Sequence, residues 1–326
     1  LAEGGRFRDD VFNLFLANVR LPDLQAHDIK AQIAANNFAA QKIWELIGRY
    51  GLDTIRACYE DIIDLTEQKT RQRLTQIRNG RYSCTDYLDY DDIYELRCTL
   101  DVRDGELFFD FTGSCEQAPS FINGALPCSV ANLHNIVTCL LLPDIPANEG
   151  SFRAVHVNIP EGTIFNCRRP APCSGSSVTS GWKVQCLTLR VLSLALRASP
   201  GLEHMANAAW GSGMVQSQYS AFRGQRWTTG TCMEGVMQGG GARASRDGVN
   251  ISNIPGSTNT SLPNVEAVEL RYPLLYHHRE LRRNSGGPGR WRGGAGGEYA
   301  FTPHKTDRLD VVLFYTGAEV PAEVMA

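Results

Sequence analysis

Apolar side chains recur at helical spacing throughout residues 1–79. The pattern predicts a short helix over residues 11–19, which ends before Pro22. Pro22 suits the first turn of the next helix, whose apolar stripe continues to Gly51. A third amphipathic helix with a strongly charged outer face then runs to Asn79. We therefore expect residues 1–79 to form a helical segment.

The pattern then changes to short alternating runs that are separated by turns. Two of these runs flank Asp104-Gly105, a dipeptide that favours a tight hairpin turn. Two longer apolar stretches, at residues 126–142 and 182–196, have helical period and few charges, which predicts buried helices. We expect residues 80–204 to form a mixed α/β region with hairpins and two buried helices.

Residues 205–326 are rich in glycine, serine and asparagine, with short apolar runs between the polar stretches. Two of these runs, Val265–Arg271 and Leu309–Tyr315, predict strands, so this part should be a glycine-rich β region. The whole pattern predicts an α+β fold. A helical N-terminal segment would be followed by an irregular, glycine-rich mixed α/β body with antiparallel strands.

Composition narrows the class of protein. The chain of 326 residues carries 32 basic and 35 acidic side chains, a net charge of −3. Binding to nucleic acid or to an anionic membrane usually needs a basic excess, so neither is expected. None of the ten cysteines lies in a C-x-x-C pair, which favours free thiols in a reducing compartment. The sequence shows neither a secretory signal nor an apolar run of membrane-spanning length, so we expect a cytoplasmic protein.

Residues 283–299 form the most glycine-dense stretch and also contain three arginines and Trp291. Glycine allows another backbone or a ligand to approach closely. An RGG-like nucleic-acid segment is one alternative, but such segments are usually repeated and the protein around them is usually basic. We interpret the stretch as an architectural loop that docks domains or subunits, with Trp291 as a buried anchor.

A second glycine cluster comprises Gly239, Gly240 and Gly241, followed by Arg243 and Asp247. The cluster lacks the Lys-Ser/Thr of a P-loop and the strand–helix context of a dinucleotide fingerprint. One interpretation is an array of tight β-turns. The other is a nest of backbone N–H groups that binds an anion, with Arg243 suited to a phosphate or carboxylate.

The scattered histidines and hydroxyls do not complete a catalytic set. His277 and His278 are adjacent, but neighbouring residues of a strand point to opposite faces and do not easily share one ion. The sequence contains neither the H-E-x-x-H spacing of a helical zinc site nor a Gly-x-Ser-x-Gly elbow. Residue chemistry alone therefore assigns no metal ligand and no catalytic group in this chain.

Several short motifs follow one another in a distinctive order: Asn18-Val19-Arg20-x-Pro22, Asp110-Phe111-Thr112-Gly113-Ser114, Ile122-Asn123-Gly124, Pro146-x-Asn148-x-Gly150, Pro160-Glu161-Gly162-Thr163, Gly239-Gly240-Gly241 with Asp247-Gly248, Pro263-x-x-Glu266 and Ser285-Gly286-Gly287-x-Gly289. This order resembles the hydantoinase B / oxoprolinase family, which includes N-methylhydantoinase B, 5-oxoprolinase B-type subunits and acetone and acetophenone carboxylase relatives. The similarity spans essentially the whole chain and corresponds to the C-terminal portion of the subunit.

The resemblance implies a B-type subunit, or a split C-terminal piece of one, in an ATP-dependent ring-opening amidohydrolase. Its substrates would be hydantoin, 5-oxoproline or lactam-like cyclic amides. A hydantoinase A-type partner would bind ATP and phosphorylate a substrate oxygen, since an O-phosphorylated amide is a better electrophile than a resonance-stabilised one. Two alternatives stay open: a subunit of an ATP-dependent ketone carboxylase of the acetone or acetophenone type, and a noncatalytic scaffold piece of such a complex.

The same resemblance selects candidate site residues. Asp247 and Glu266 are the candidate catalytic residues. The candidate substrate-binding residues are Asn123, Asn148, Gly239, Gly240, Gly241 and Arg243.

Family members usually carry a further N-terminal portion with the His/Asp segment that resembles a metal site. We therefore expect the divalent metal in that portion, supplied as a separate or cleaved chain within a hetero-oligomer. The chain starts at Leu1 rather than at a methionine, which favours a fragment, a processed product or one piece of a split subunit.

Overall fold

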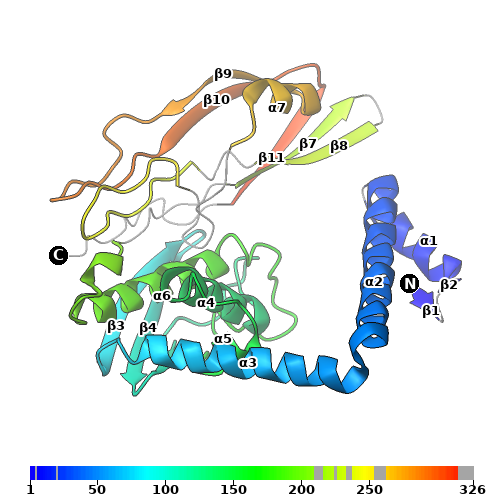
Figure 1. Ribbon diagram of the computed structural model, residues 1–326. Helices are drawn as coiled ribbons and strands as arrows, with labels where there is room; N and C mark the ends of the chain where they lie inside the picture. The colour runs from blue at the N-terminus through cyan, green and yellow to red at the C-terminus, as the bar shows by residue number, and fades with distance from the viewer. Residues whose placement is uncertain are drawn as a thin grey trace.

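The computed structural model describes residues 1–3, 6–19, 21–208, 216–223, 226–232, 237–252 and 262–314, with the backbone alone for 216–223, 226–232 and 312–314. A helical arm leads into an α/β body, and a β-rich part lies above that body (Figure 1). Helices and mainly antiparallel strands thus occupy successive parts of the chain. The predicted α+β class is confirmed, whereas domain boundaries at residues 79 and 204 stay predictions.

The N-terminal arm consists of three helices, as the apolar spacing predicts. They follow a two-strand ribbon: β1 (Ala2–Glu3), β2 (Arg6–Phe7), α1 (Asp9–Ala17), α2 (Pro22–Tyr50) and α3 (Leu52–Leu74). Pro22 occupies the first turn of α2, and Gly51, with φ 85°, separates α2 from α3. No residue of α2 is buried, and Figure 1 shows that this helix runs away from the body. The second half of α3 packs on the body through Thr66, Thr70 and Leu74.

A four-stranded sheet forms one layer of the body. Its strands, in spatial order, are β3 (Gly80–Asp89), β4 (Ile93–Arg103), β5 (Glu106–Asp110) and β6 (Val155–Asn158). Asp104 and Gly105 both have positive φ, 48° and 83°, so the predicted hairpin turn between β4 and β5 is confirmed. β5 and β6 are parallel, and the crossover between them contains α4 (Leu126–Leu141) and the short α5 (Glu149–Phe152).

Helix α6 (Ser180–Arg197) lies at the centre of the body, between the sheet and α4. All of its residues except Leu194 and Arg197 are buried, including several polar side chains. Lys183 Nζ lies 3.4 Å from Asp86 Oδ2, and Arg190 donates a hydrogen bond to a backbone carbonyl of β3. The predicted burial of this helix is therefore confirmed, and its charged residues are accommodated by partners on β3.

The C-terminal part contains a three-stranded sheet and a two-stranded ribbon. The elements are the 3-10 helix η1 (Glu203–Met205), β7 (Gln216–Arg223), β8 (Arg226–Cys232), α7 (Val265–Arg271), β9 (Leu274–Leu281), β10 (Gly297–Pro303) and β11 (Arg308–Phe314). The order is β11-β7-β8 in the sheet, and β9 pairs antiparallel with β10 in the ribbon. The strand predicted at 309–315 is confirmed over its described residues.

The strand predicted at Val265–Arg271 is wrong, because this segment is helix α7. The side chain of Asn264 accepts a hydrogen bond from the Glu266 N–H at 2.9 Å and caps the first turn. Val268 is buried beside Leu274 of β9 in a small apolar cluster, which holds this short helix against the ribbon.

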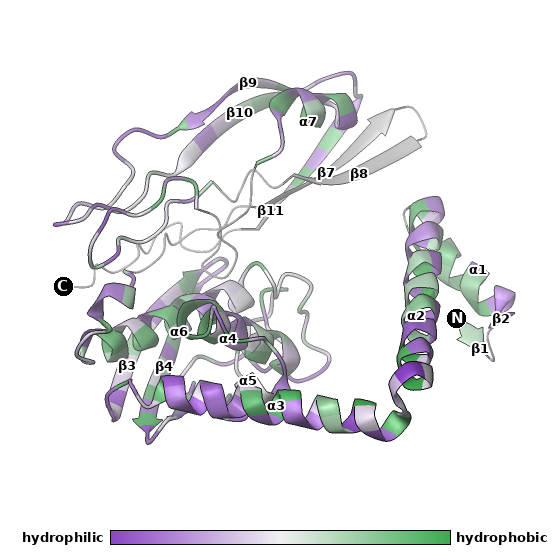
Figure 2. Ribbon diagram, in the orientation of Figure 1, coloured by the Kyte–Doolittle hydropathy of each residue, from purple (hydrophilic) through white to green (hydrophobic). Residues whose placement is uncertain are grey.

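Apolar side chains stay exposed along α2 and the adjoining half of α3, where green and purple alternate in Figure 2. These exposed residues are Leu24, Phe38, Ile43, Trp44, Leu46, Tyr50, Leu52, Tyr59, Ile62 and Leu65. Apolar side chains left exposed in this number along one segment indicate an interaction surface. No helix among the described residues combines the length and the apolar character needed to cross a bilayer.

Candidate functional site

The two glycine-rich stretches meet in one structure, which we call the glycine junction. It consists of three backbone segments: residues 237–241, 247–252 and 292–297. The Gly240 N–H donates to the Val249 carbonyl at 2.9 Å, and the Gly240 carbonyl accepts from the Gly294 N–H at 2.9 Å. Gly248 N–H donates to the carbonyl of Arg292 at 2.8 Å. Each segment is therefore bonded to both of the others.

The glycines of the junction allow backbones to approach more closely than any side chain would permit. A Cβ on Gly239 would lie 1.8 Å from the Gly294 carbonyl oxygen, and one on Gly294 would lie 1.9 Å from the Val249 carbonyl oxygen. A Cβ on Gly248 would lie 2.1 Å from the carbonyl oxygen of Gly240. The obstructing atoms are backbone, so they cannot rotate away. Close backbone packing accounts for these glycines, and the Gly240 N–H is already bonded within the junction.

Asp247 holds the 282–296 loop against the junction. Its Oδ1 accepts the backbone N–H of Arg292 at 2.9 Å, and its Oδ2 lies 3.6 Å from Arg292 Nε. Asn250 adds a second anchor, because its Oδ1 accepts the Ala295 N–H at 2.8 Å. Sequence reasoning missed Asn250, although an asparagine shortly after an Asp-Gly turn often bonds to nearby backbone.

Arg243 is a partly buried cation beside the junction. Its backbone pairs with Asn207 and with Arg246 in isolated bridges. Burial lowers the pKa of Arg243, and the neighbouring Arg246 charge adds to this effect. The Arg243 side chain makes no ion pair with any residue that the structure describes. A partly buried cation without a carboxylate partner favours an anionic ligand.

Two buried carboxamides, one in the glycine junction and one paired through its backbone with Arg243, have side-chain atoms without partners among the described residues. Gln238 is only 7% exposed, yet neither its Nε2 nor its Oε1 is hydrogen-bonded to any residue that the structure describes. Asn207, the backbone neighbour of Arg243, is 7% exposed, and its Oδ1 has no hydrogen-bond partner within the described part of the chain. Buried polar atoms without partners are costly and uncommon in native proteins. Neither residue was selected from the sequence, since nothing in the local pattern distinguishes it.

Asn123 is buried in the body and organises two loops. Its Oδ1 accepts the Ala118 N–H at 2.7 Å, and its Nδ2 donates to the carbonyls of Ala118, Ser120 and Pro172 at 2.9, 2.9 and 3.0 Å. The amide is fully engaged within the protein, so a structural role accounts for it. Contact between Asn123 and a substrate stays a prediction.

Asn148 is the N-cap of α5. Its Oδ1 accepts the Gly150 N–H at 2.9 Å, and its Nδ2 donates to Thr66 of α3 at 3.0 Å. Gly150 touches α3 so closely that a Cβ there would lie 2.0 Å from the Ile63 carbonyl oxygen. Asn148 therefore joins α5 to α3, and its contact with a substrate also stays a prediction.

Glu266 and Trp291 lie differently from expectation. Glu266 belongs to the first turn of α7 rather than to the start of a strand, and its side chain is exposed. No hydrogen bond or ion pair of its carboxylate occurs among the described residues, so its catalytic role stays a prediction. Trp291 is 38% exposed, so it is not buried within this chain, and its burial against another subunit stays a prediction.

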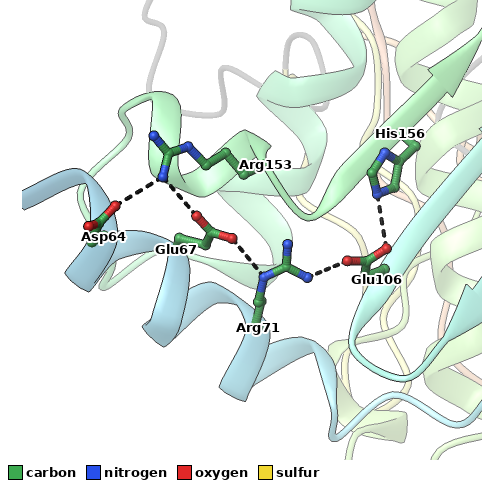
Figure 3. Close-up of polar contacts among 6 residues, drawn as sticks. All are labelled: Asp64, Glu67, Arg71, Glu106, Arg153 and His156. Carbon is green, nitrogen blue, oxygen red and sulfur yellow. Dashed lines mark hydrogen bonds and ion pairs between the residues drawn. The ribbon is translucent and has the colours of Figure 1, made fainter. Parts of the chain in front are cut away.

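An ionic network joins α3 to the crossover and the sheet edge (Figure 3). Arg153 Nη1 lies 3.0 Å from Asp64 and 2.9 Å from Glu67. Arg71 bonds both Glu67 and Glu106, and Glu106 also accepts from His156 at 3.1 Å.

These arginines lower two carboxyl pKa values. Arg153 and then Arg71 lower that of Glu67, and Arg71, aided by His156, lowers that of Glu106. The network is a stabilising device distinct from the glycine junction.

Among the described residues, one group of side chains could hold a metal ion: His278, Glu280 and Glu298 on the β9–β10 ribbon. All three are exposed, and their ligand atoms lie within 4.8 Å of one another. The sequence did not reveal the group, since its members come from two strands on either side of a long loop.

Comparison with known proteins identifies the family to which the chain belongs. Residues 1–324 match the family described as Hydantoinase B/oxoprolinase. The chain belongs to this family, and the resemblance deduced from the ordered motifs is confirmed.

Particular relatives are of several kinds. The caprolactamase subunit beta of Pseudomonas jessenii is 30% identical over 97% of this chain and 55% of its own length. The crystal structure of the ATP-dependent caprolactamase from that organism matches with a TM-score of 0.79, at 26% identity over 93% of this chain and 52% of that one.

Carboxylases are also similar. The acetophenone carboxylase delta subunit of Aromatoleum aromaticum is 24% identical over 95% of this chain and 46% of its own length. A nucleotide-free structure of acetone carboxylase has a TM-score of 0.87 over 99% of this chain and 46% of that one, at 19% identity, which shows the shared fold. The chain spans about half the length of these relatives.

Proposed function

We propose that this chain is part of a B-type subunit of an ATP-dependent amidohydrolase that opens lactam-like cyclic amides, with hydantoin and 5-oxoproline as further candidate substrates. The observation that carries the proposal is the 30% identity with a caprolactamase subunit beta over 97% of the chain. The family match over residues 1–324 supports the same class.

The chemistry around the glycine junction supports such a substrate. Arg243 offers a partly buried positive charge to an anionic or phosphorylated oxygen. Gln238 offers an amide donor and an amide acceptor, which match the donor and acceptor of a cyclic amide. Asp247 is the candidate acid or base beside this surface, and Glu266 is a second candidate.

ATP would be bound by a hydantoinase A-type partner, which phosphorylates the substrate oxygen. The exposed apolar face of α2 and α3 supports a hetero-oligomer, because such a surface normally needs a covering partner. The divalent metal of the family would be held by a further portion of the B-type subunit. A cytoplasmic location remains part of this proposal.

The test is ATP-coupled ring opening of caprolactam by the chain assembled with its A-type partner and the remaining B-type portion. Asp247→Asn keeps an acceptor for the Arg292 N–H but removes the charge. Glu266→Gln removes the charge of the exposed carboxylate on α7 with little change in shape. Each should abolish turnover while the complex still assembles and unfolds at the wild-type temperature. Full turnover in both variants would refute the two catalytic assignments.

Ketone carboxylation is the second candidate, favoured by the similarity to the acetophenone carboxylase delta subunit over 95% of the chain. The same complex should be offered acetone or acetophenone with bicarbonate and ATP. Ketone-dependent consumption of bicarbonate without lactam opening would select the carboxylase. If the A-type partner is fully active with a complete B-type subunit and without this chain, the chain is a scaffold.

A further inference from the structure

The β9–β10 ribbon carries a His-Glu-Glu cluster at the point where the 282–296 loop leaves it. Glu280 and Glu298 are directly opposite one another in the antiparallel register. Glu280 is the last residue but one of β9, and Glu298 is the second residue of β10. Just beyond this pair, the Arg282 N–H donates to the Gly296 carbonyl at 2.9 Å. The cluster thus lies at the base of the loop that completes the glycine junction.

Strand geometry places the three side chains on one face. His278 and Glu280 are two positions apart, so their side chains project from the same side of β9. Glu298 projects from the same side because opposite residues of an antiparallel pair share a face. Ala300 stands opposite His278 and, with its short side chain, leaves the imidazole room to turn toward the carboxylates. The ligand atoms accordingly fall within 4.8 Å of one another.

The two carboxylates are not neutralised by neighbouring protein cations. No ion pair joins Glu280 or Glu298 to a described residue, whereas Glu67 and Glu106 in the ionic network each bond an arginine. Like charges directly opposite in an antiparallel pair destabilise the pairing. A bound cation would convert this repulsion into attraction, and the imidazole nitrogen gives that cation a third ligand.

We propose that His278, Glu280 and Glu298 bind one divalent transition-metal ion, with Zn²⁺ preferred to Mg²⁺. One imidazole nitrogen and two carboxylate oxygens form a ligand set typical of zinc, while Mg²⁺ favours oxygen ligands and retains water. Three protein ligands leave a coordination position for solvent or for a side chain of a partner. The ion would clamp β9 to β10 and thereby fix the base of the 282–296 loop.

The first test is calorimetric titration of the full, chelator-treated chain with Zn²⁺ and, separately, with Mg²⁺. His278→Ala and Glu298→Gln should each weaken the zinc site by about tenfold or more, or remove one equivalent of bound zinc. His277→Ala is the matched control, since it alters the neighbouring histidine on the opposite face and should bind as wild type. Zinc held by exposed cysteines would persist in all variants.

A second measurement tests the clamp. Zn²⁺ should slow tryptic cleavage of the loop at Arg290 and Arg292 in the wild-type chain, but not in Glu298→Gln. Unchanged zinc binding in both His278→Ala and Glu298→Gln would overturn the site. Zinc binding that is lost in these variants, but gives no protection of the wild-type loop, would overturn the clamp.

Discussion

The carboxylate of Asp247 accepts the backbone N–H of Arg292 at 2.9 Å, across 45 positions of sequence. This bond, together with the close approach of Gly239 to Gly294, makes the two glycine-rich stretches of the chain a single unit. The 282–296 loop, which looks independent in the sequence, is therefore part of the glycine junction, and substitutions in either stretch should affect both.

Gly239→Ala should disrupt the glycine junction. The new Cβ would lie 1.8 Å from a backbone carbonyl oxygen, so the backbones must separate at a cost of about 3 kcal/mol in the free energy of unfolding. Gly287→Ala is the control, because no described atom beyond the two adjoining residues lies within 4 Å of its added Cβ. Denaturant unfolding of the two variants measures the difference, and equal midpoints would contradict the close packing described for the junction.

Gly150→Ala should detach α5 from α3. Its Cβ would meet the Ile63 carbonyl oxygen at 2.0 Å, and the Asn148–Thr66 hydrogen bond would be strained with it. We expect a loss of about 3 kcal/mol. Gly48→Ala, in the exposed interior of α2 with open space around it, should instead stabilise its helix by up to about 1 kcal/mol. A lower unfolding temperature for Gly48→Ala than for Gly150→Ala would contradict the close contact between α5 and α3.

Lys183→Met should leave the Asp86 carboxylate without its cation in the body core. Removing one partner of a buried pair costs about 3 kcal/mol or more, because the remaining charge stays desolvated. The double variant Lys183→Met/Asp86→Leu should recover most of that loss, since it removes both charges. Urea unfolding of the wild type, both single variants and the double variant completes the cycle. Additive losses would show that the two side chains are not coupled.

Acid should weaken the attachment of α3 to the sheet edge. The pKa values of Glu67 and Glu106 are lowered by their arginine partners, so their contribution is present above the unfolded glutamate pKa of about 4.3. That contribution is lost as the pH falls through the lowered folded-state values.

Unfolding free energies measured from pH 7 to pH 2 should therefore fall less steeply in Glu106→Gln than in the wild type. The variant should be less stable at pH 7, where the ionised carboxylate helps most. Parallel curves for the two proteins would mean that Glu106 has the same pKa folded and unfolded.

The local pattern of residue types was sufficient to predict structural features that depend on residues close together in the sequence. Apolar spacing predicted the helices of the arm, α4 and α6, and Asp104-Gly105 predicted the hairpin turn, since both depend on a few adjacent residues. Segment 265–271 was misjudged because two β-branched valines in a short run favour a strand, whereas the Asn264 cap and the burial of Val268 decide for a helix.

Features made by distant segments were beyond local pattern. Gly239 meets Gly294 across a long stretch of sequence, and Glu280 meets Glu298 because β9 and β10 pair in one register around the loop between them. Gln238 stands out only through its burial without partners, which no run of residue types reveals. Ordered motifs did identify the family, because their succession samples the whole chain.

Gly51 is the hinge residue between α2 and α3 of the helical arm. Helix α2 has 29 residues and no buried side chain, so its direction relative to the body depends largely on the two backbone torsions of the glycine that joins it to α3. At 1.5 Å per residue the helix is about 44 Å long, and a turn of about 10° at Gly51 moves its far end by roughly 8 Å. A partner bound to α1 would therefore move by several ångströms when the backbone at Gly51 rotates by a few degrees.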